Sequence, residues 1–317
     1  MNLRELIGDI TPETKRQRQA RVHQGWWRAF VLGQKQGPRP NNPSQKICNT
    51  LNADVAGLAN FVSKEIGELA MNTAKEHGNA GANKAGIIQV DRLKTNLLSS
   101  QPLCFNFFGL FALDHSLGLR VIKTFFPEVT GLRDVRFEYA PTPRSSFTDD
   151  NSAFDVVFEV EAGDAIGLIG VECKYTEPFS PKEYRTIRYK QLYDASQNFN
   201  ASYDALTDSA FNQLFRNQII AEALLQSDTY DFVKTALFCS PDDADAKRVG
   251  ARFSQMLKSG FTVFDYFELI AAMQKLELTE PQRNISMLLW ARYIALDLSK
   301  MAFQQYESAV HLTKTEA

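Results

Sequence analysis

Between residues 153 and 177, hydrophobic positions gather in two short runs that flank a turn-forming break. Val, Ile and Phe dominate both runs, and the break between them contains Gly163 and Asp164. Short β-branched and aromatic runs around a Gly-containing break predict a β-hairpin. If the turn is centred between Gly163 and Asp164, residues 155 and 172 lie opposite each other.

This hairpin brings three ionisable residues together. The register places Asp155 across from Glu172, and Lys174 lies two residues further along the second strand. Because side chains alternate faces along a strand, Glu172 and Lys174 share one face. Charges at the end of an apolar ribbon are costly unless something compensates them. A divalent metal ion would do so.

The same patterning predicts the remaining elements. They are a helical arm and a Pro/Gly/Asn-rich connector over 1–46, a mostly helical stretch over 46–77, a helix over 87–100, an apolar core helix over 101–127, a strand over 134–140, helices over 182–195 and 209–226, a strand over 232–240, a helix over 244–259, a short strand over 261–264, a helix over 268–276 and a C-terminal helix from near Pro281 to beyond Met301. From residue 101 the order is helix, strand, strand, strand, helix, strand. We therefore predict an α/β fold with an αβββαβ core, a mixed sheet flanked by helices, and extra N- and C-terminal helices.

Composition narrows the class of protein. The chain has 317 residues, 44% of them hydrophobic and 23% charged, as in an ordinary soluble domain. Four cysteines are widely separated and form no metal-binding spacing, which favours a reducing compartment. The N-terminus lacks the apolar segment of a signal peptide, and no apolar run is long enough to cross a bilayer. We expect a cytoplasmic protein that does not contact a membrane.

Charge is unevenly distributed. The net charge is −2, yet residues 1–46 hold nine Lys and Arg against three Asp and Glu. A basic cluster lies beside Trp26 and Trp27; its members are Lys15, Arg16, Arg18, Arg21 and Arg28. Such a patch can follow a phosphate backbone. The alternative is an amphipathic helix whose tryptophans dock on the core, and the sequence leaves both open.

The predicted hairpin carries the parts that metal-dependent phosphodiester hydrolysis requires. Mg²⁺ uses one or two carboxylates and keeps several waters, so Asp155 and Glu172 are candidate ligands, with the backbone carbonyl of Cys173 as a third. Lys174 could orient or deprotonate the attacking water, or neutralise charge on the phosphate. A Glu-x-Lys pattern alone is weak, since Glu13-Thr14-Lys15 matches it too. The alternative is an ordinary ion pair at a solvated sheet end.

Three phrases of the sequence resemble a known family. An Asp followed after sixteen residues by Glu-x-Lys, within this order of elements, looks like the PD-(D/E)xK nuclease superfamily. The phrases SAFDVVFEV, GVECKYTEP and NLLSSQPLCFNFFG resemble predicted bacterial restriction endonucleases within it, over residues 92–240. Phe154 stands where the family usually has Pro. The resemblance implies metal-dependent DNA cleavage with Mg²⁺, or Mn²⁺, with Asp155 and Glu172 as ligands and Lys174 as the lysine.

The resemblance also points to supporting residues. A further acidic residue often completes such sites, and Glu138 on the preceding strand is the candidate, with Glu177 a weaker one. Related nucleases use a Gln or basic residue on the helix after the hairpin to hold phosphate or water, a role that Gln213 and Arg216 fit. A further basic cluster close to the hairpin could bind the DNA backbone; it comprises Arg185, Arg188 and Lys190. Each of these could instead be an ordinary surface side chain.

These features predict three regions. They are a helical N-terminal region with a basic arm over 1–86, a PD-(D/E)xK nuclease core over 87–270 and a C-terminal helical extension over 271–317. The leading hypothesis is a metal-dependent DNA endonuclease, in restriction or phage defence. The alternatives are a low-specificity repair or degradative nuclease, and a dormant nucleic-acid-binding protein on the same fold. A homodimer would supply two active sites for double-strand cutting, and the sequence leaves it open.

Overall fold

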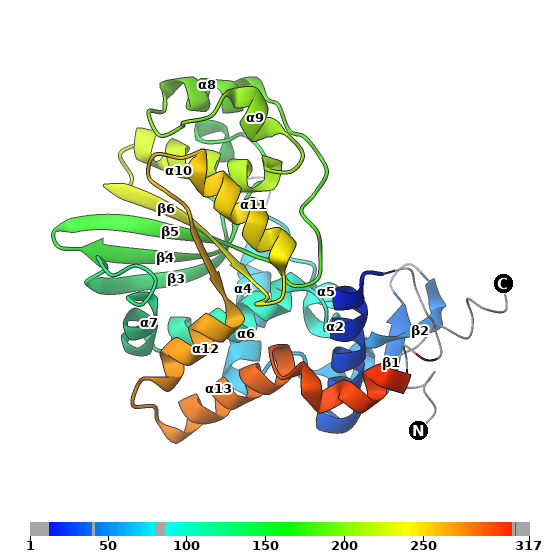
Figure 1. Ribbon diagram of the computed structural model, residues 1–317. Coiled ribbons are helices and arrows are strands. Elements are labelled where there is room, and N and C mark those ends of the chain that lie inside the picture. The colour runs from blue at the N-terminus through cyan, green and yellow to red at the C-terminus, as the bar shows by residue number, and fades with distance from the viewer. Residues whose placement is uncertain (1–12, 40–41, 80–85, 306–307, 309–317) are drawn as a thin grey trace.

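A five-stranded mixed sheet forms the centre of the molecule (Figure 1). The computed structural model describes residues 13–39, 42–79, 86–305 and 308. The strands lie in chain order, as β3 (Gly131–Tyr139), β4 (Phe154–Ala162), β5 (Ala165–Cys173), β6 (Phe232–Cys239) and β7 (Thr262–Asp265). The first three are antiparallel, whereas β6 and β7 run parallel to β5. The predicted α/β class and mixed sheet are confirmed.

The β4–β5 hairpin has the register that its turn predicts. Ala162 pairs with Ala165, and the ladder continues without a shift to Val156 opposite Val171. Gly163 adopts a φ of +62° in the turn, a left-handed conformation that suits glycine. One further step along the register brings Asp155 opposite Glu172, as expected.

Helices cover both faces of the sheet (Figure 1). One face carries α6 (Ser100–Leu113), α7 (His115–Ile122) and α12 (Tyr266–Gln274), and the other carries α10 (Asn212–Gln226) and α11 (Ala244–Gln255). The short helices α8 (Ile187–Ala195) and α9 (Tyr203–Thr207) lie over α10. The predicted core helix over 101–127 is divided into α6 and α7, because Asp114 ends α6 and its side chain caps α7 by accepting from the Leu117 amide. The helix α6 is apolar almost all round, and Phe107 and Phe108 both pack against Phe238 of β6.

The N-terminal region combines helices with a strand pair. A capping box of Thr14 and Gln17 begins α2 (Lys15–Trp26), which passes into a π-helical segment η1 (Trp27–Val31). The strands β1 (Gln36–Arg39) and β2 (Asn42–Leu51) follow, then α3 (Ala53–Ala56) and α4 (Lys64–Asn79).

The prediction of a connector ending at residue 46 and a helix from there to residue 77 is therefore wrong over the strand residues 36–39 and 42–51 and over the turns of residues 57–63, whereas α3 and α4 are helical as predicted. Ile47 and Leu51 are four residues apart, a spacing that fits both the helical period and strand alternation. Pairing with β1 decides between the two.

The predicted helix over 87–100 is also too long. Only α5 (Val90–Thr95) forms, because polar side chains that follow it accept hydrogen bonds from backbone amides. The side chain of Asn96 accepts a hydrogen bond from the Leu98 amide, and that of Ser99 caps α6 by accepting from Gln101. Such local bonds compete with helix continuation.

The C-terminal helix begins where predicted but is not continuous. Helix α13 (Glu280–Tyr293) has Pro281 in its first turn and ends eight residues before Met301; η4 (Leu296–Ser299) follows. Side chains of α2 take the carbonyl groups that a longer helix would use. Nε2 of His23 donates to Ala291 O, and Nε2 of Gln24 donates to Arg292 O.

One hydrophobic cluster contains residues from all three predicted regions, such as Ile66 from α4, Phe158 from β4 and Tyr293 from α13. Among the described residues, no helix is both long and apolar enough to cross a membrane.

Candidate active site

Three carboxylates lie in a row across neighbouring strands. The β3–β4 register pairs Phe137 with Val156 and Tyr139 with Phe154, so Glu138 faces Asp155 between them. The β4–β5 ladder ends at Val156 opposite Val171, so Asp155 lies one step further, next to Glu172 of β5, whose charge acts on it. The sheet therefore brings together the two residues predicted as metal ligands and the predicted third carboxylate.

Glu138 is held in an unusual conformation. Its φ is +48°, a left-handed value that non-glycine residues seldom adopt and that often marks functional positions. Its carboxylate accepts a hydrogen bond of 2.6 Å from Nε2 of Gln101, at the start of α6. Burial, and secondarily the charge of Glu172, raise the pKa of Glu138 to about 7, although the hydrogen bond from Gln101 opposes the shift.

Asp155 is the centre of the row. Its Oδ2 accepts a hydrogen bond of 2.6 Å from the Cys173 amide, which fixes the carboxylate against β5. Burial raises its pKa well above the ordinary value, and the charges of Glu172 and Glu138 raise it further. Without a cation, burial and the neighbouring carboxylates therefore favour the protonated form of Asp155.

Glu172 and Lys174 meet two amides from α10. Oε1 of Glu172 lies 3.2 Å from Nζ of Lys174, and both side chains are more than nine-tenths buried. Gln213 joins them: its Nε2 donates to Oε1 of Glu172 at 2.5 Å, and its Oε1 accepts from Nζ of Lys174 at 2.8 Å. Asn217, one turn later, donates to the other Glu172 oxygen at 2.8 Å. The predicted helix therefore leans over the cluster through Gln213.

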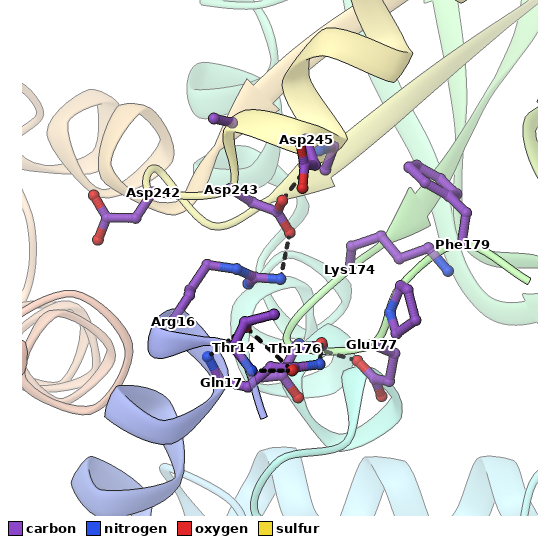
Figure 2. A pocket seen from close by; sticks show the side chains of 13 residues that line it. Thr14, Arg16, Gln17, Lys174, Thr176, Glu177, Phe179, Asp242, Asp243 and Asp245 are labelled. Carbon is purple, nitrogen blue, oxygen red and sulfur yellow. Dashed lines mark hydrogen bonds and ion pairs between the residues drawn. The ribbon is translucent and has the colours of Figure 1, made fainter. Parts of the chain in front are cut away.

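Lys174 also lines a pocket with a volume of approximately 370 Å³, whose lining residues Figure 2 shows. Its walls come from the segment after β5, from the first turn of α2 and from the N-terminus of α11. Lys174 lines it together with Phe179, whose ring centroid lies 5.0 Å from Nζ. The lysine is thus shared between the carboxylate row and an open hollow.

The donor set of the row fits a magnesium-like cation. In the part of the chain that the structure describes, no three His, Cys, Asp or Glu side chains form a metal-binding group, but Mg²⁺ commonly takes one or two carboxylates and several waters. Asp155 and Glu172 supply these. Cys173 can contribute only its carbonyl oxygen, because its thiol lies in the core beside Cys104 and burial raises the thiol pKa.

Gln101 supports the same conclusion. Its Nε2 donates to Ile87 O and to Glu138, so its Oε1 lies beside the row, buried and without a hydrogen-bond partner among the described residues. A buried acceptor without a donor is costly. A hydrated cation next to Glu138 would provide the donor.

The other predicted basic residues contact partners elsewhere. Arg216 stacks 4.2 Å over the Tyr184 ring, and its Nε donates to Oγ of Ser152 at 2.9 Å. The cluster predicted to bind the DNA backbone lies before and within α8, where each member has its own partners: Arg185 pairs with Asp204 and Glu183, Arg188 donates to the Ser146 and Phe147 carbonyls, and Lys190 pairs with Asp194. None of these contacts connects Arg216 or the three residues of the α8 cluster to the carboxylate row.

Glu177, the weaker acidic candidate, has a visible structural role. It pairs with Arg92 at 3.1 Å and accepts from the Ser100 amide at 2.9 Å, at the first turn of α6. An acidic group there is favoured by the helix dipole.

The basic N-terminal helix docks on the molecule. Trp27 is 4% exposed and Arg28 is buried, while Arg21 pairs with Glu13. These contacts support the interpretation in which the basic segment docks on the core through its tryptophans. The Glu13-Thr14-Lys15 pattern lies at the start of the helix α2 rather than on a strand of the sheet.

Sequence reasoning missed two residues of the site, Gln101 and Asn217. Gln101 is a polar residue in the first turn of a mostly apolar helix, and Asn217 follows Gln213 by one helical turn. An i, i+4 search for amides beside Gln213 would have found Asn217.

Comparison with known proteins adds one match. The sequence model of a family described as the PD-(D/E)XK nuclease superfamily matches residues 11–295, which extends beyond residues 92–240, where the family-like phrases lie. No curated protein and no solved structure matches the chain. With a family match over most of its length, the chain belongs to the PD-(D/E)XK nuclease superfamily.

Proposed function

We propose that this protein is a divalent-metal-dependent endonuclease that hydrolyses phosphodiester bonds in DNA. The observation that carries the proposal is the row of Glu138, Asp155 and Glu172 with the buried Lys174 at its end. Membership of the nuclease superfamily supports a nucleic-acid substrate.

Asp155 and Glu172 would hold the cation, with the Cys173 carbonyl as a further ligand. A bound Mg²⁺ or Mn²⁺ lowers the pKa of a coordinated water and stabilises negative charge on the phosphate. Glu138, held by Gln101, adds a third carboxylate next to Asp155. It can accept a proton near neutral pH, because burial raises its pKa to about 7.

Lys174 would act on the phosphate or on the attacking water. Its ammonium group is held between Glu172 and Gln213, so it presents a fixed positive charge without a large loss of side-chain entropy on binding. Gln213 sets this position, because its oxygen accepts from Lys174 and from the Ser180 amide while its nitrogen donates to Glu172. Fixed charges and dipoles aimed at developing negative charge are the main source of such catalysis.

DNA as substrate, a role in restriction or phage defence, and a homodimer that cuts both strands are the finer parts of the proposal. The resemblance of SAFDVVFEV and GVECKYTEP to predicted restriction endonucleases favours them. A low-specificity repair or degradative nuclease would use the same residues. A dormant nucleic-acid-binding protein would not need all of them.

The test is incubation of the purified full chain with supercoiled plasmid, linear DNA and single-stranded RNA, each with Mg²⁺ or Mn²⁺. Lys174→Met keeps the length of the side chain and removes its charge. Lys123→Met, at the exposed C-cap of α7, is the matched control. We expect wild type and Lys123→Met to cut DNA and Lys174→Met to be about 100- to 1,000-fold slower, as for loss of charge stabilisation in an active site.

The products separate the alternatives. Discrete bands favour restriction, and a smear favours degradation. Cleavage of RNA alone would refute the assignment to DNA. Tight binding of DNA with no cleavage under any condition would refute the enzyme and favour a dormant binding protein.

A further inference from the structure

The segment that follows β5 is held by side chains rather than by the sheet. The Lys174 amide still donates to Phe238 O at 2.8 Å, but β5 ends at Cys173. Beyond it, the Lys174 carbonyl accepts from the hydroxyl of Tyr266 in α12. Buried backbone carbonyls need such partners once the ladder stops.

Helix α2 supplies the next two partners. Nη1 of Arg16 donates to Tyr175 O at 2.7 Å, and Nε2 of Gln17 donates to Thr176 O at 3.1 Å. Two turns later on the same helix, Nε2 of Gln24 donates to the Tyr175 hydroxyl at 2.8 Å. Both the backbone and the side chain of Tyr175 are thus bound to an element that lies about 150 residues earlier in the chain.

Arg16 also joins this segment to α11. Its Nη2 forms an ion pair of 2.8 Å with Asp243, the N-cap residue of α11, whose side chain is 8% exposed (Figure 2). One guanidinium therefore connects three elements around the pocket that Lys174 lines. The planar guanidinium fork suits such a bridge, since its donors point in fixed directions.

We propose that Arg16, together with Gln17, is a positioning residue for Lys174: it fixes the backbone directly after the lysine and thereby the place of the ammonium group beside Glu172. This inference rests on the proposed function for its catalytic consequence. It assigns to the basic N-terminal helix a role in ordering the active site rather than in attracting nucleic acid.

The physical reason is that the backbone held by α2 is directly next to Lys174 in the chain. Tyr175 is the residue next to Lys174, so a shift of its backbone moves the lysine directly. Three α2 contacts, from Arg16, Gln17 and Gln24, hold Tyr175 and Thr176, and Glu172 and Gln213 hold the Nζ atom. Loss of the Arg16 contact leaves the ammonium group with its two partners but on a looser backbone.

The first measurement is steady-state cleavage by Arg16→Met, Arg16→Lys and Lys15→Ala in the full chain. Lys15 is the exposed neighbour on α2, so its variant removes the same charge without touching the segment. We expect Arg16→Met to lower kcat by about 10- to 100-fold, as for a small misplacement of a catalytic group, with KM for DNA changed by less than about twofold. Arg16→Lys should recover part of kcat, and Lys15→Ala should keep both values.

Lys15→Ala and Arg16→Met could instead lose cleavage efficiency equally, through a higher KM that recovers at low salt. That result would overturn positioning and favour electrostatic attraction of DNA.

The second measurement does not depend on activity. Hydrogen–deuterium exchange over residues 172–179 should be faster in Arg16→Met than in wild type and unchanged in Lys15→Ala. Unchanged exchange in Arg16→Met would overturn the inference even if cleavage falls. An inactive wild type would refute the proposed function alone, and the exchange result would still decide whether Arg16 holds this segment.

Discussion

Glu138 combines a left-handed backbone, a hydrogen bond from Gln101 and a carboxyl pKa near 7. Its folded pKa lies above the ordinary value of 4.5, so the folded state binds the proton more tightly than the unfolded state does. The stability associated with this proton is present below pH 4.5 and is lost as the pH rises through about 7.

We therefore expect Glu138→Gln to reduce the loss of stability between pH 4.5 and 8 by on the order of 1–3 kcal/mol in metal-free protein, while cleavage falls. Urea unfolding at several pH values measures this. Glu161→Gln, in which a half-exposed carboxylate on β4 is neutralised, is the control. An identical pH profile for wild type and Glu138→Gln would show that the folded protein does not hold this proton.

Gln213 is the second residue with a clear expected effect. Gln213→Ala removes the acceptor of Lys174 and a donor to Glu172, so we expect kcat to fall by about 10- to 100-fold, as for removal of groups that orient metal ligands. Gln226→Ala, at the exposed end of the same helix, should retain wild-type kcat. If Gln213→Ala cleaves as fast as Gln226→Ala, the amide has no part in the reaction.

At the scale of elements, the hairpin was the most predictable feature. Its register follows from one turn and from strict alternation, so positions 155 and 172 could be placed opposite each other from local sequence alone. Gln101 and Asn217 could not be placed, because they reach the site from helices whose docking on the sheet has no local signal. The second half of β2 has a pattern that also predicts helix, because Ile47 and Leu51 fit either period.

Gly170 on β5 has a specific packing requirement. A Cβ atom there would lie 2.3 Å from the ring of Phe154, the residue before Asp155. We expect Gly170→Ala to destabilise the protein by about 1–3 kcal/mol, as overpacking does, and to slow cleavage by displacing Asp155. Gly78→Ala on α4 is the control, because a Cβ there meets nothing within 4 Å. Thermal unfolding measures both variants. Equal melting temperatures for wild type and Gly170→Ala would mean that the Phe154 ring can move without cost.

His23 couples α2 to the C-terminal region. Burial, assisted by Arg292, lowers its pKa to about 4 although the bond to Ala291 O opposes this. A lowered pKa means that the unfolded state takes up the proton first. Stability is therefore lost as the pH falls from 6.5 towards 4.

The expected loss attributable to His23 is on the order of 3 kcal/mol. His23→Gln cannot ionise and should show a smaller loss over the same interval, as measured by denaturant unfolding at pH 7 and pH 4.5. Parallel pH profiles for the two proteins would show that His23 is protonated in the folded state.

At the scale of the whole molecule, the helices outside the αβββαβ core belong to the same packed unit. The cluster that joins α4, β4 and α13 and the contacts of α2 with Tyr175 cross all three predicted regions. The family match over residues 11–295 likewise includes parts of all three regions. The sequence predicted the α/β core, whereas the closure of α2 around the active end of the sheet depends on contacts between residues far apart in the chain.

The central claim is that the carboxylate row makes this molecule a metal-dependent nuclease. Its most direct measurement is single-turnover DNA cleavage by wild type, Asp155→Asn and Glu161→Gln, with Mg²⁺ chelated and then restored. Both substitutions neutralise one carboxylate on the same strand, but only Asp155 lies in the row. We predict cleavage by wild type and Glu161→Gln only after Mg²⁺ is restored, and none by Asp155→Asn. Cleavage that persists under chelation, or that Asp155→Asn retains, would contradict the account.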